Sequence, residues 1–194
     1  MDQERFEKAL IFAAQAHQGQ NRKGSDVPYI THPIMLAMTL LEMDCADDLI
    51  VAALLHDVIE DTETTLTQIE TEFGPAVAQL VDAVSEPDRQ AAWEVRKQHT
   101  IDKLRQAPVS VKLIACADKL HNIRSICKDY QTLGEAVWAR FKRGKESQAW
   151  YYRGLADSLP TGLESPETYP IFAQFRQEVT NLFGPHPPTN QPTN

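Results

Sequence analysis

Residues 49–62 read Leu-Ile-Val-Ala-Ala-Leu-Leu-His-Asp-Val-Ile-Glu-Asp-Thr. The first seven are apolar nearly all round, which predicts a buried helix. Residues three and four apart share a helix face, so we expect one helix that continues to near Asp61, with His56 beside Glu60 and Asp57 beside Asp61. An imidazole and three carboxylates at the end of a buried helix need a compensating charge. The stretch therefore predicts a site for a divalent metal.

Helical periodicity extends outward from this stretch to both ends of the chain, and no segment shows the two-residue alternation of a strand. We therefore predict an all-α fold with one domain. The domain is expected over residues 1–160, with a C-terminal helical extension packed on it over 161–183 and a disordered tail over 184–194. The expected helices cover residues 3–18, 32 onward, 49–61, 65–74, 77–84, 93–104, 109–130, two segments after 135, and 167–183.

Length and composition limit the class of protein. The 194 residues carry a formal net charge of −8, with 24% charged residues and three cysteines. An acidic chain is a poor general binder of DNA or RNA, so we expect no long nucleic acid as partner. The start of the chain resembles no leader peptide and no apolar run reaches membrane-spanning length, so no membrane is expected. Three cysteines without a CxxC pair indicate free thiols and a cytoplasmic location.

Two further segments hold candidate metal ligands. His32 precedes Pro33 at a helix entrance, and Asp118 lies on an apolar helix where an acid needs a partner. Taken alone, His32 would be a capping residue, and Asp118 would form a salt bridge to Lys112 or Arg124. Taken together with the central stretch, they complete a set of two imidazoles and two carboxylates suited to manganese, iron or zinc. The candidate ligands are His32, His56, Asp57 and Asp118.

A hydrolytic metal site also needs an acid or base beside the attacking water. Glu60 and Asp61 are not among the four candidate ligands, and they are our candidate catalytic residues. His121 lies third from Asp118, so an outer contact to the metal site is conceivable. The aromatic run Trp150, Tyr151 and Tyr152 is expected in the core, because large aromatic side chains chiefly bury area.

Four motifs in order resemble the hydrolase domain of the Rel/SpoT proteins and the stand-alone small alarmone hydrolases, which are HD-domain phosphohydrolases. They are Gly-Gln-Asn-Arg-Lys at 19–23, Pro-Tyr-Ile-Thr-His-Pro at 28–33, His-Asp-Val-Ile-Glu-Asp-Thr at 56–62 and Ala-Asp-Lys-Leu-His-Asn at 117–122. The likeness covers about residues 6–130. It implies a helical HD-domain fold for residues 1–160.

The resemblance also implies an activity. The family hydrolyses the guanosine tetra- and pentaphosphate alarmones of the stringent response, with a manganese ion, to GDP or GTP and pyrophosphate. Carried over, the four candidate ligands would hold the metal, and Glu60 and Asp61 would orient and deprotonate the attacking water. A small guanine nucleotide would be the partner. Its contacts would come from Arg22, Lys23, Tyr29 and Asn122.

The chain departs from the family pattern at residues 24–27 and at Ala115-Cys116, where the usual Lys one turn before Asp118 is absent. A basic cluster over residues 140–145 could reach distal phosphates or could be a solvated surface. Two alternatives therefore stay open for function. One is an HD phosphohydrolase acting on another nucleotide, such as an NADPH phosphatase or a nucleoside triphosphate hydrolase. The other is a non-catalytic guanine-nucleotide sensor. The sequence leaves the oligomeric state open.

Overall fold

The computed structural model describes residues 1–86 and 90–185, and these residues form helices without any strand, which confirms the all-α prediction. A lone antiparallel bridge joins Asn21 and Pro28. Within these ranges no helix has the length and apolar character needed to cross a bilayer. The predicted disordered tail lies outside the described residues from 186 onward. The elements are α1 (Gln3–Ala16), α2 (Thr31–Glu42), α3 (Asp47–Leu55), α4 (Val58–Asp61), α5 (Leu66–Phe73), α6 (Pro75–Val84), α7 (Trp93–Gln106), α8 (Val109–Leu133), η1 (Gly134–Arg140), α9 (Lys145–Ser158), η2 (Pro166–Thr168) and α10 (Pro170–Phe183).

Local sequence explains where several helices begin and end. At the start of α5, the Thr65 hydroxyl accepts a hydrogen bond from the Gln68 N–H, and the Gln68 side chain accepts one from the Thr65 N–H. This reciprocal capping box was predicted from the sequence and is confirmed. Gly74 ends α5 with a φ of 90°, a conformation that favours glycine. Pro75 then begins α6, where its missing N–H has no helical partner to lose.

The central stretch differs from the prediction of one continuous helix to Asp61. Helix α3 ends at Leu55, Asp57 adopts φ −101° and ψ −4°, and the short helix α4 begins at Val58. Consecutive residues of a continuous helix point about 100° apart, so His56 and Asp57 would diverge there. The break removes that divergence and brings both side chains to the same point. The expectation of one continuous helix through His56 and Glu60 was therefore wrong, although both side chains line the same cavity.

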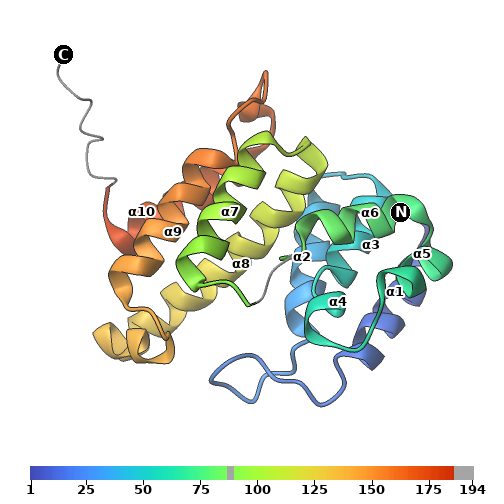
Figure 1. The fold of residues 1–194 in the computed structure, drawn as a ribbon, viewed down its shortest axis with the longest axis horizontal. Coiled ribbons are helices and arrows are strands. Elements are labelled where there is room, and N and C mark those ends of the chain that lie inside the picture. Colours follow the sequence, from blue (N-terminus) through green and yellow to red (C-terminus); the bar gives the residue numbers. More distant parts are fainter. Residues whose placement is uncertain (87–89, 186–194) are drawn as a thin grey trace.

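Helix α8 connects the two halves of the molecule (Figure 1). It packs against α2, α3 and α6 on one side and against α10 on the other, while α7 and α10 both pack on α9. The buried stripe of α8 includes Ile114, Ala117, Leu120 and Ile123, as its helical periodicity predicted. The apolar residues 50–55 of α3 are also completely or almost completely buried. The start of α2, with His32, and the end of α3, next to His56, therefore lie close to the middle of α8.

The aromatic run on α9 divides between core and surface. Tyr151 and Tyr152 are buried as predicted, but Trp150 is 41% exposed and the prediction for it was wrong. Adjacent helix positions point in different directions, so a run of three cannot share one buried face. Trp150 lies instead near Trp93 of α7, with ring centroids 6.0 Å apart.

Candidate active site

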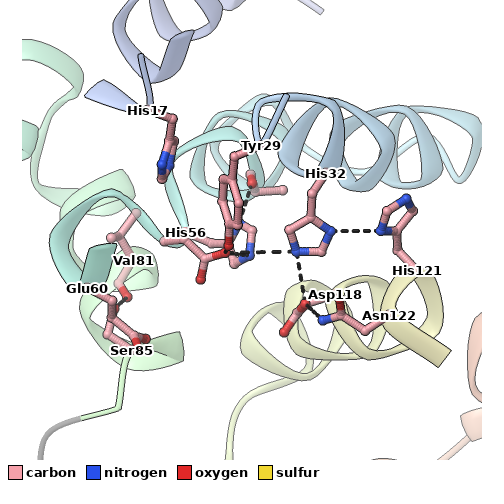
Figure 2. Close-up of polar contacts among 12 residues, drawn as sticks. His17, Tyr29, His32, His56, Glu60, Val81, Ser85, Asp118, His121 and Asn122 are labelled. Carbon is pink, nitrogen blue, oxygen red and sulfur yellow. Dashed lines mark hydrogen bonds and ion pairs between the residues drawn. The ribbon is translucent and has the colours of Figure 1, made fainter. Parts of the chain in front are cut away.

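Two buried histidines form the centre of the site, and each has one ring nitrogen held by a neighbour (Figure 2). The Nδ1 of His56 lies 2.9 Å from the carbonyl oxygen of Ala53, so Nδ1 carries the proton and donates it. The Nδ1 of His32 lies 2.8 Å from Nδ1 of His121. Burial, followed by the charge of His32, lowers the pKa of His121 to about 4, so His121 is neutral and accepts. Both central imidazoles thus direct Nε2 toward the same space.

Carboxylates from two elements meet these Nε2 atoms. An Oδ2 of Asp57 lies 2.8 Å from Nε2 of His56 and 3.8 Å from Nε2 of His32. From the middle of α8, Oδ1 of Asp118 lies 3.1 Å from Nε2 of His32. The hydroxyl of Tyr29 donates a hydrogen bond to the same Oδ2 of Asp57 and so helps to fix that carboxylate. All four predicted ligands therefore converge.

The pKa values of His56 and Asp57 depend on each other. Burial alone would lower the pKa of His56, but the adjoining Asp57 carboxylate raises it to about 9. Burial favours the neutral form of Asp57 as well, yet the charge of His56 holds the pKa of Asp57 below its usual value. The two side chains therefore share a positive charge, which is a proton on His56 or a metal ion bound to both.

The donor set fits a divalent metal. His32, His56 and Asp118 each offer a ligand atom, and these three atoms lie within 4.8 Å of one another. The Nε2 of His56 is buried, and within the described ranges its 2.8 Å contact with Oδ2 of Asp57 does not have hydrogen-bond geometry, which leaves this nitrogen suited to bind a metal. Imidazole nitrogen with carboxylate oxygen is a mixed set suited to divalent transition metals. The ring nitrogens facing away from the site are already held, which is typical of metal-binding histidines.

Asp118 has a different partner from those the sequence suggested. The candidates Lys112 and Arg124 are engaged elsewhere: the amine of Lys112 donates to the carbonyl oxygens of Arg105 and Thr161, and Arg124 pairs with Glu178. Instead, Nζ of Lys119 lies 2.5 Å from Oδ2 of Asp118. Burial disfavours the charged carboxylate, but Lys119 and then His32 hold the pKa of Asp118 well below its usual value.

The two candidate catalytic acids do not face the same space. Glu60 faces a cavity of about 120 Å³ that His56, Asp57 and Asp118 also line. Its Oε1 accepts a hydrogen bond of 3.0 Å from the backbone N–H of Glu86, and burial raises its pKa. Asp61 lies at the end of α4 and lines a neighbouring hollow with Gln20. Glu60 is therefore better placed than Asp61 to accept a proton from a water beside the metal ligands.

Three of the four predicted nucleotide contacts lie close together, next to the metal-ligand candidates. Nη2 of Arg22 donates to Oδ1 of Asn122 at 2.6 Å, and its guanidinium lies over the ring of Tyr29 at 5.6 Å. Asn122 in turn donates its side-chain N–H to Oδ1 of Asp118. Arg22, Tyr29 and Asn122 thus form one group next to the metal ligands. Lys23 is exposed and lies over the ring of Phe141 instead.

Two contributors to the site received no role from the sequence. His17 is 3% exposed, its Nδ1 lies 2.8 Å from the side-chain oxygen of Gln20, and its ring packs on Tyr29 with centroids 4.6 Å apart. The amide of Gln20 donates to the backbone carbonyl of Asp61. Lys119 is the second, through its contact with Asp118. The conceivable contact of His121 is present, as its bond to His32 shows.

The basic cluster over residues 140–145 forms ion pairs at the surface. Arg140 pairs with Asp129, Arg143 with Glu94, and Lys145 with Glu135. Each pair is at least partly exposed, and none of these basic residues lines the cavity beside the metal ligands. The geometry therefore favours the solvated-surface interpretation over a contact to distal phosphates.

A helical fold that brings two histidines and two aspartates from three segments to one point defines an HD-domain protein. The HD domain family matches residues 9–146 of this chain, and the chain belongs to that family. Among curated relatives, it is 39% identical over 122 residues to the mouse guanosine-3′,5′-bis(diphosphate) 3′-pyrophosphohydrolase MESH1, covering 61% of this chain and 68% of the relative. It is 39% identical over 128 residues to the bifunctional (p)ppGpp synthase/hydrolase SpoT of Escherichia coli K12.

Solved structures share the fold. The crystal structure of lmo0812 from Listeria monocytogenes EGD-e has a TM-score of 0.74 and 37% identity, covering 78% of this chain and 98% of that one. A metazoan orthologue of SpoT that hydrolyzes ppGpp also has a TM-score of 0.74, with 28% identity, covering 93% and 96% of the two chains. The similarity to E. coli SpoT covers 63% of this chain but only 18% of the longer relative.

Proposed function

We propose that the protein is a metal-dependent phosphohydrolase that converts guanosine 3′,5′-bis(diphosphate) alarmones to GDP or GTP and pyrophosphate. The observation that carries the proposal is the convergence of His32, His56 and Asp118, with ligand atoms within 4.8 Å of one another. Similarity to MESH1 and to the metazoan SpoT orthologue supports the choice of substrate. The candidate nucleotide group around Arg22 lies directly beside that centre.

The candidate metal ligands in this proposal are His32, His56, Asp57 and Asp118, and the metal is Mn²⁺. A divalent metal in such a site neutralises phosphate charge and lowers the pKa of bound water. Tyr29 holds Asp57 in position through its hydroxyl, and His121 holds His32 through Nδ1. These contacts keep both side chains oriented toward the reacting phosphate.

Proton transfer falls mainly to Glu60. Its raised pKa suits a group that accepts a proton from the attacking water near neutral pH. The water oxygen bonds to the phosphorus attached to O3′, the bond from that phosphorus to O3′ breaks, and O3′ takes up a proton. Asp61 lines the neighbouring hollow, so its predicted part in catalysis is secondary to that of Glu60 in this proposal. Arg22 and Asn122 hold the nucleoside, with Lys23 at the edge of the same loop.

The test is a turnover assay with a nucleotide panel. Purified protein with Mn²⁺ is offered guanosine 3′,5′-bis(diphosphate), GTP and NADPH, and pyrophosphate and phosphate are measured separately. Pyrophosphate release from the alarmone is expected. Phosphate release from NADPH or GTP instead would show an HD phosphohydrolase of different specificity. Tight guanine-nucleotide binding without turnover of any substrate would show a sensor, and the proposal would be wrong.

A matched pair of variants connects turnover to the site. Asp118→Asn removes the carboxylate charge from the candidate metal centre and should reduce turnover by more than the roughly 10–100-fold typical of outer-shell partners. Asp82→Asn makes the same chemical change at an exposed position of α6 and should leave turnover unchanged. Equal activity in the two variants would contradict the assignment of Asp118.

A further inference from the structure

The cavity that Glu60 faces extends from the metal-ligand candidates to helix α7, and we call it the α7 cavity. It has a volume of about 120 Å³, and its α7 side is lined by Lys97, Thr100 and Lys103. In Figure 2, Glu60 and Ser85 lie on one side of the His32–His56 pair, and Asn122 and His121 lie on the other. Ser85 lines the α7 cavity. The cavity and the candidate nucleoside group therefore flank the metal-ligand candidates from opposite sides.

Three lysine side chains line the α7 cavity of an otherwise acidic protein. Lys97 and Lys103 come from α7, and Lys119 comes from α8 beside Asp118. Among the described residues, the amine of Lys103 approaches the backbone carbonyl of Ser85 at 3.5 Å. Within the described ranges these three amines face the acids Glu60, Glu86, Asp57 and Asp118. A divalent metal would add two positive charges and leave the cavity with a net positive charge that attracts an anion.

One carboxylate, that of Glu86, holds two of the cations on α7. Its Oε1 lies 2.5 Å from Nζ of Lys97, and its other oxygen pairs with Arg96. All three side chains are largely buried, with exposed fractions of 16% for Glu86, 18% for Lys97 and 22% for Arg96. The Nε–H of Arg96 is buried and has no acceptor in the part of the chain that the structure describes. Among the described residues, Arg96 and Lys97 thus share one carboxylate, and their remaining N–H groups could bind an anion.

We propose that the α7 cavity binds the diphosphate end of the substrate and then the departing pyrophosphate, and that Glu86 is an internal counter-ion for which this anion competes. The proposal rests on the proposed function, because it places the 3′ diphosphate of that substrate. The nucleoside lies at Arg22 and Asn122, the phosphate attached to O3′ lies at the metal ligands, and the distal phosphate lies near Lys97. The metal-ligand candidates thus lie between the other two positions.

This orientation has a consequence for specificity. A substrate with a single phosphate at the reacting position would leave Lys97 paired with Glu86 and gain nothing from the α7 cavity. A diphosphate gains a charge-assisted contact with Lys97, and the metal that binds its first phosphate raises the attraction for the second. The α7 cavity therefore favours substrates that release pyrophosphate over those that release phosphate.

Calorimetric titration of inorganic pyrophosphate into protein loaded with one equivalent of Mn²⁺ tests the proposal without turnover. Lys97→Gln removes a cation from the cavity and should weaken binding about tenfold, the size of one charge-assisted hydrogen bond. Glu86→Gln removes the competing carboxylate and should tighten binding severalfold. The control is Lys8→Gln, which breaks an exposed ion pair with Glu72 away from the cavity and should leave binding unchanged.

The opposite signs separate a binding site from a loss of folding, because misfolding would weaken binding in both variants. Thermal unfolding of each variant checks that it is folded. The proposal is overturned if the unmodified protein does not bind pyrophosphate. It is also overturned if Lys97→Gln and Lys8→Gln weaken binding equally, or if Glu86→Gln weakens binding. If the protein hydrolyses the alarmone but Lys97→Gln binds pyrophosphate as tightly as the unmodified protein, this subsite is wrong and the proposed function stands. If pyrophosphate binding changes as expected but the alarmone is not hydrolysed, the cavity binds pyrophosphate and the proposed function is wrong.

Discussion

At the scale of single residues, Tyr29 shows how an outer side chain prepares the candidate metal centre. Its hydroxyl donates to Asp57, and burial followed by the charge of Asp57 raises its pKa, so it remains a donor at neutral pH. Its ring is held between His17 and the guanidinium of Arg22. The Oδ2 of Asp57 that the histidines approach therefore also receives a fixed hydrogen bond from Tyr29.

We predict that Tyr29→Phe weakens Mn²⁺ binding by about 10–100-fold, the range usual for outer-shell partners of metal ligands. The ring and its packing are kept, so the change isolates the hydroxyl. Titration of metal-free protein with Mn²⁺ measures the affinity. The matched control is Tyr130→Phe, which removes a hydroxyl bound to the exposed Glu135 and should leave the affinity unchanged. Equal affinities in the two variants would contradict the role of Tyr29.

At the scale of elements, α7 and α9 approach each other at a glycine. A Cβ placed on Gly154 would lie 2.5 Å from Cδ1 and 3.2 Å from Cγ1 of Ile101, which is buried in α7. Alanine in place of glycine normally stabilises a helix interior. At this contact the added methyl group overpacks a close interface, and the overpacking cost exceeds the helical gain.

Gly154→Ala should therefore lower the free energy of unfolding by about 1 kcal/mol, the difference between an overpacking cost of about 2 kcal/mol and a helical gain of about 1 kcal/mol. Urea unfolding measures it. Adding Ile101→Val removes the Cδ1 atom that the new methyl group meets, so the double variant should recover part of the loss even though Ile101→Val alone destabilises. Simple addition of the two single effects would show that the methyl group causes no clash.

At the scale of the whole molecule, a metal at this site would join three elements that are distant in sequence. His32 comes from α2, His56 from the end of α3 and Asp118 from the middle of α8, which packs on both halves. Any ligand bound by the folded state alone stabilises it. The metal-ligand group therefore connects local binding to global stability.

Removal of metal should lower the thermal unfolding midpoint. Restoring Mn²⁺ to about 100 times its dissociation constant should add roughly 2.7 kcal/mol, which is on the order of 5–10 °C for a chain of this size. Thermal unfolding with a chelator and with added Mn²⁺ measures the difference. Asp118→Asn should show little of this response. An identical midpoint with and without metal would contradict a metal centre in this fold.

The sequence predicted the parts of the fold and site that depend on short-range pattern. Helical periodicity and capping residues such as Thr65 and Gly74 predicted most helices, and the spaced motifs predicted the convergence of His32 and Asp118 on the central pair. The break at Asp57 was missed because it depends on tertiary contacts, which bring the adjacent side chains of His56 and Asp57 to one point, and not on the local sequence pattern. Lys119 was missed because adjacent helix positions diverge, and only its long side chain allows it to fold back onto Asp118.

The amide of Asn122 is shared: its oxygen accepts from Arg22 and its nitrogen donates to Asp118. A nucleotide bound to Arg22 would change the hydrogen bond that this amide donates to Asp118. A metal bound to Asp118 would change the hydrogen bond that the amide accepts from Arg22. Thermodynamic reciprocity then requires that whatever factor nucleotide occupancy applies to metal affinity, metal occupancy applies to nucleotide affinity. In the proposed function, this one carboxamide would couple the binding of the two ligands.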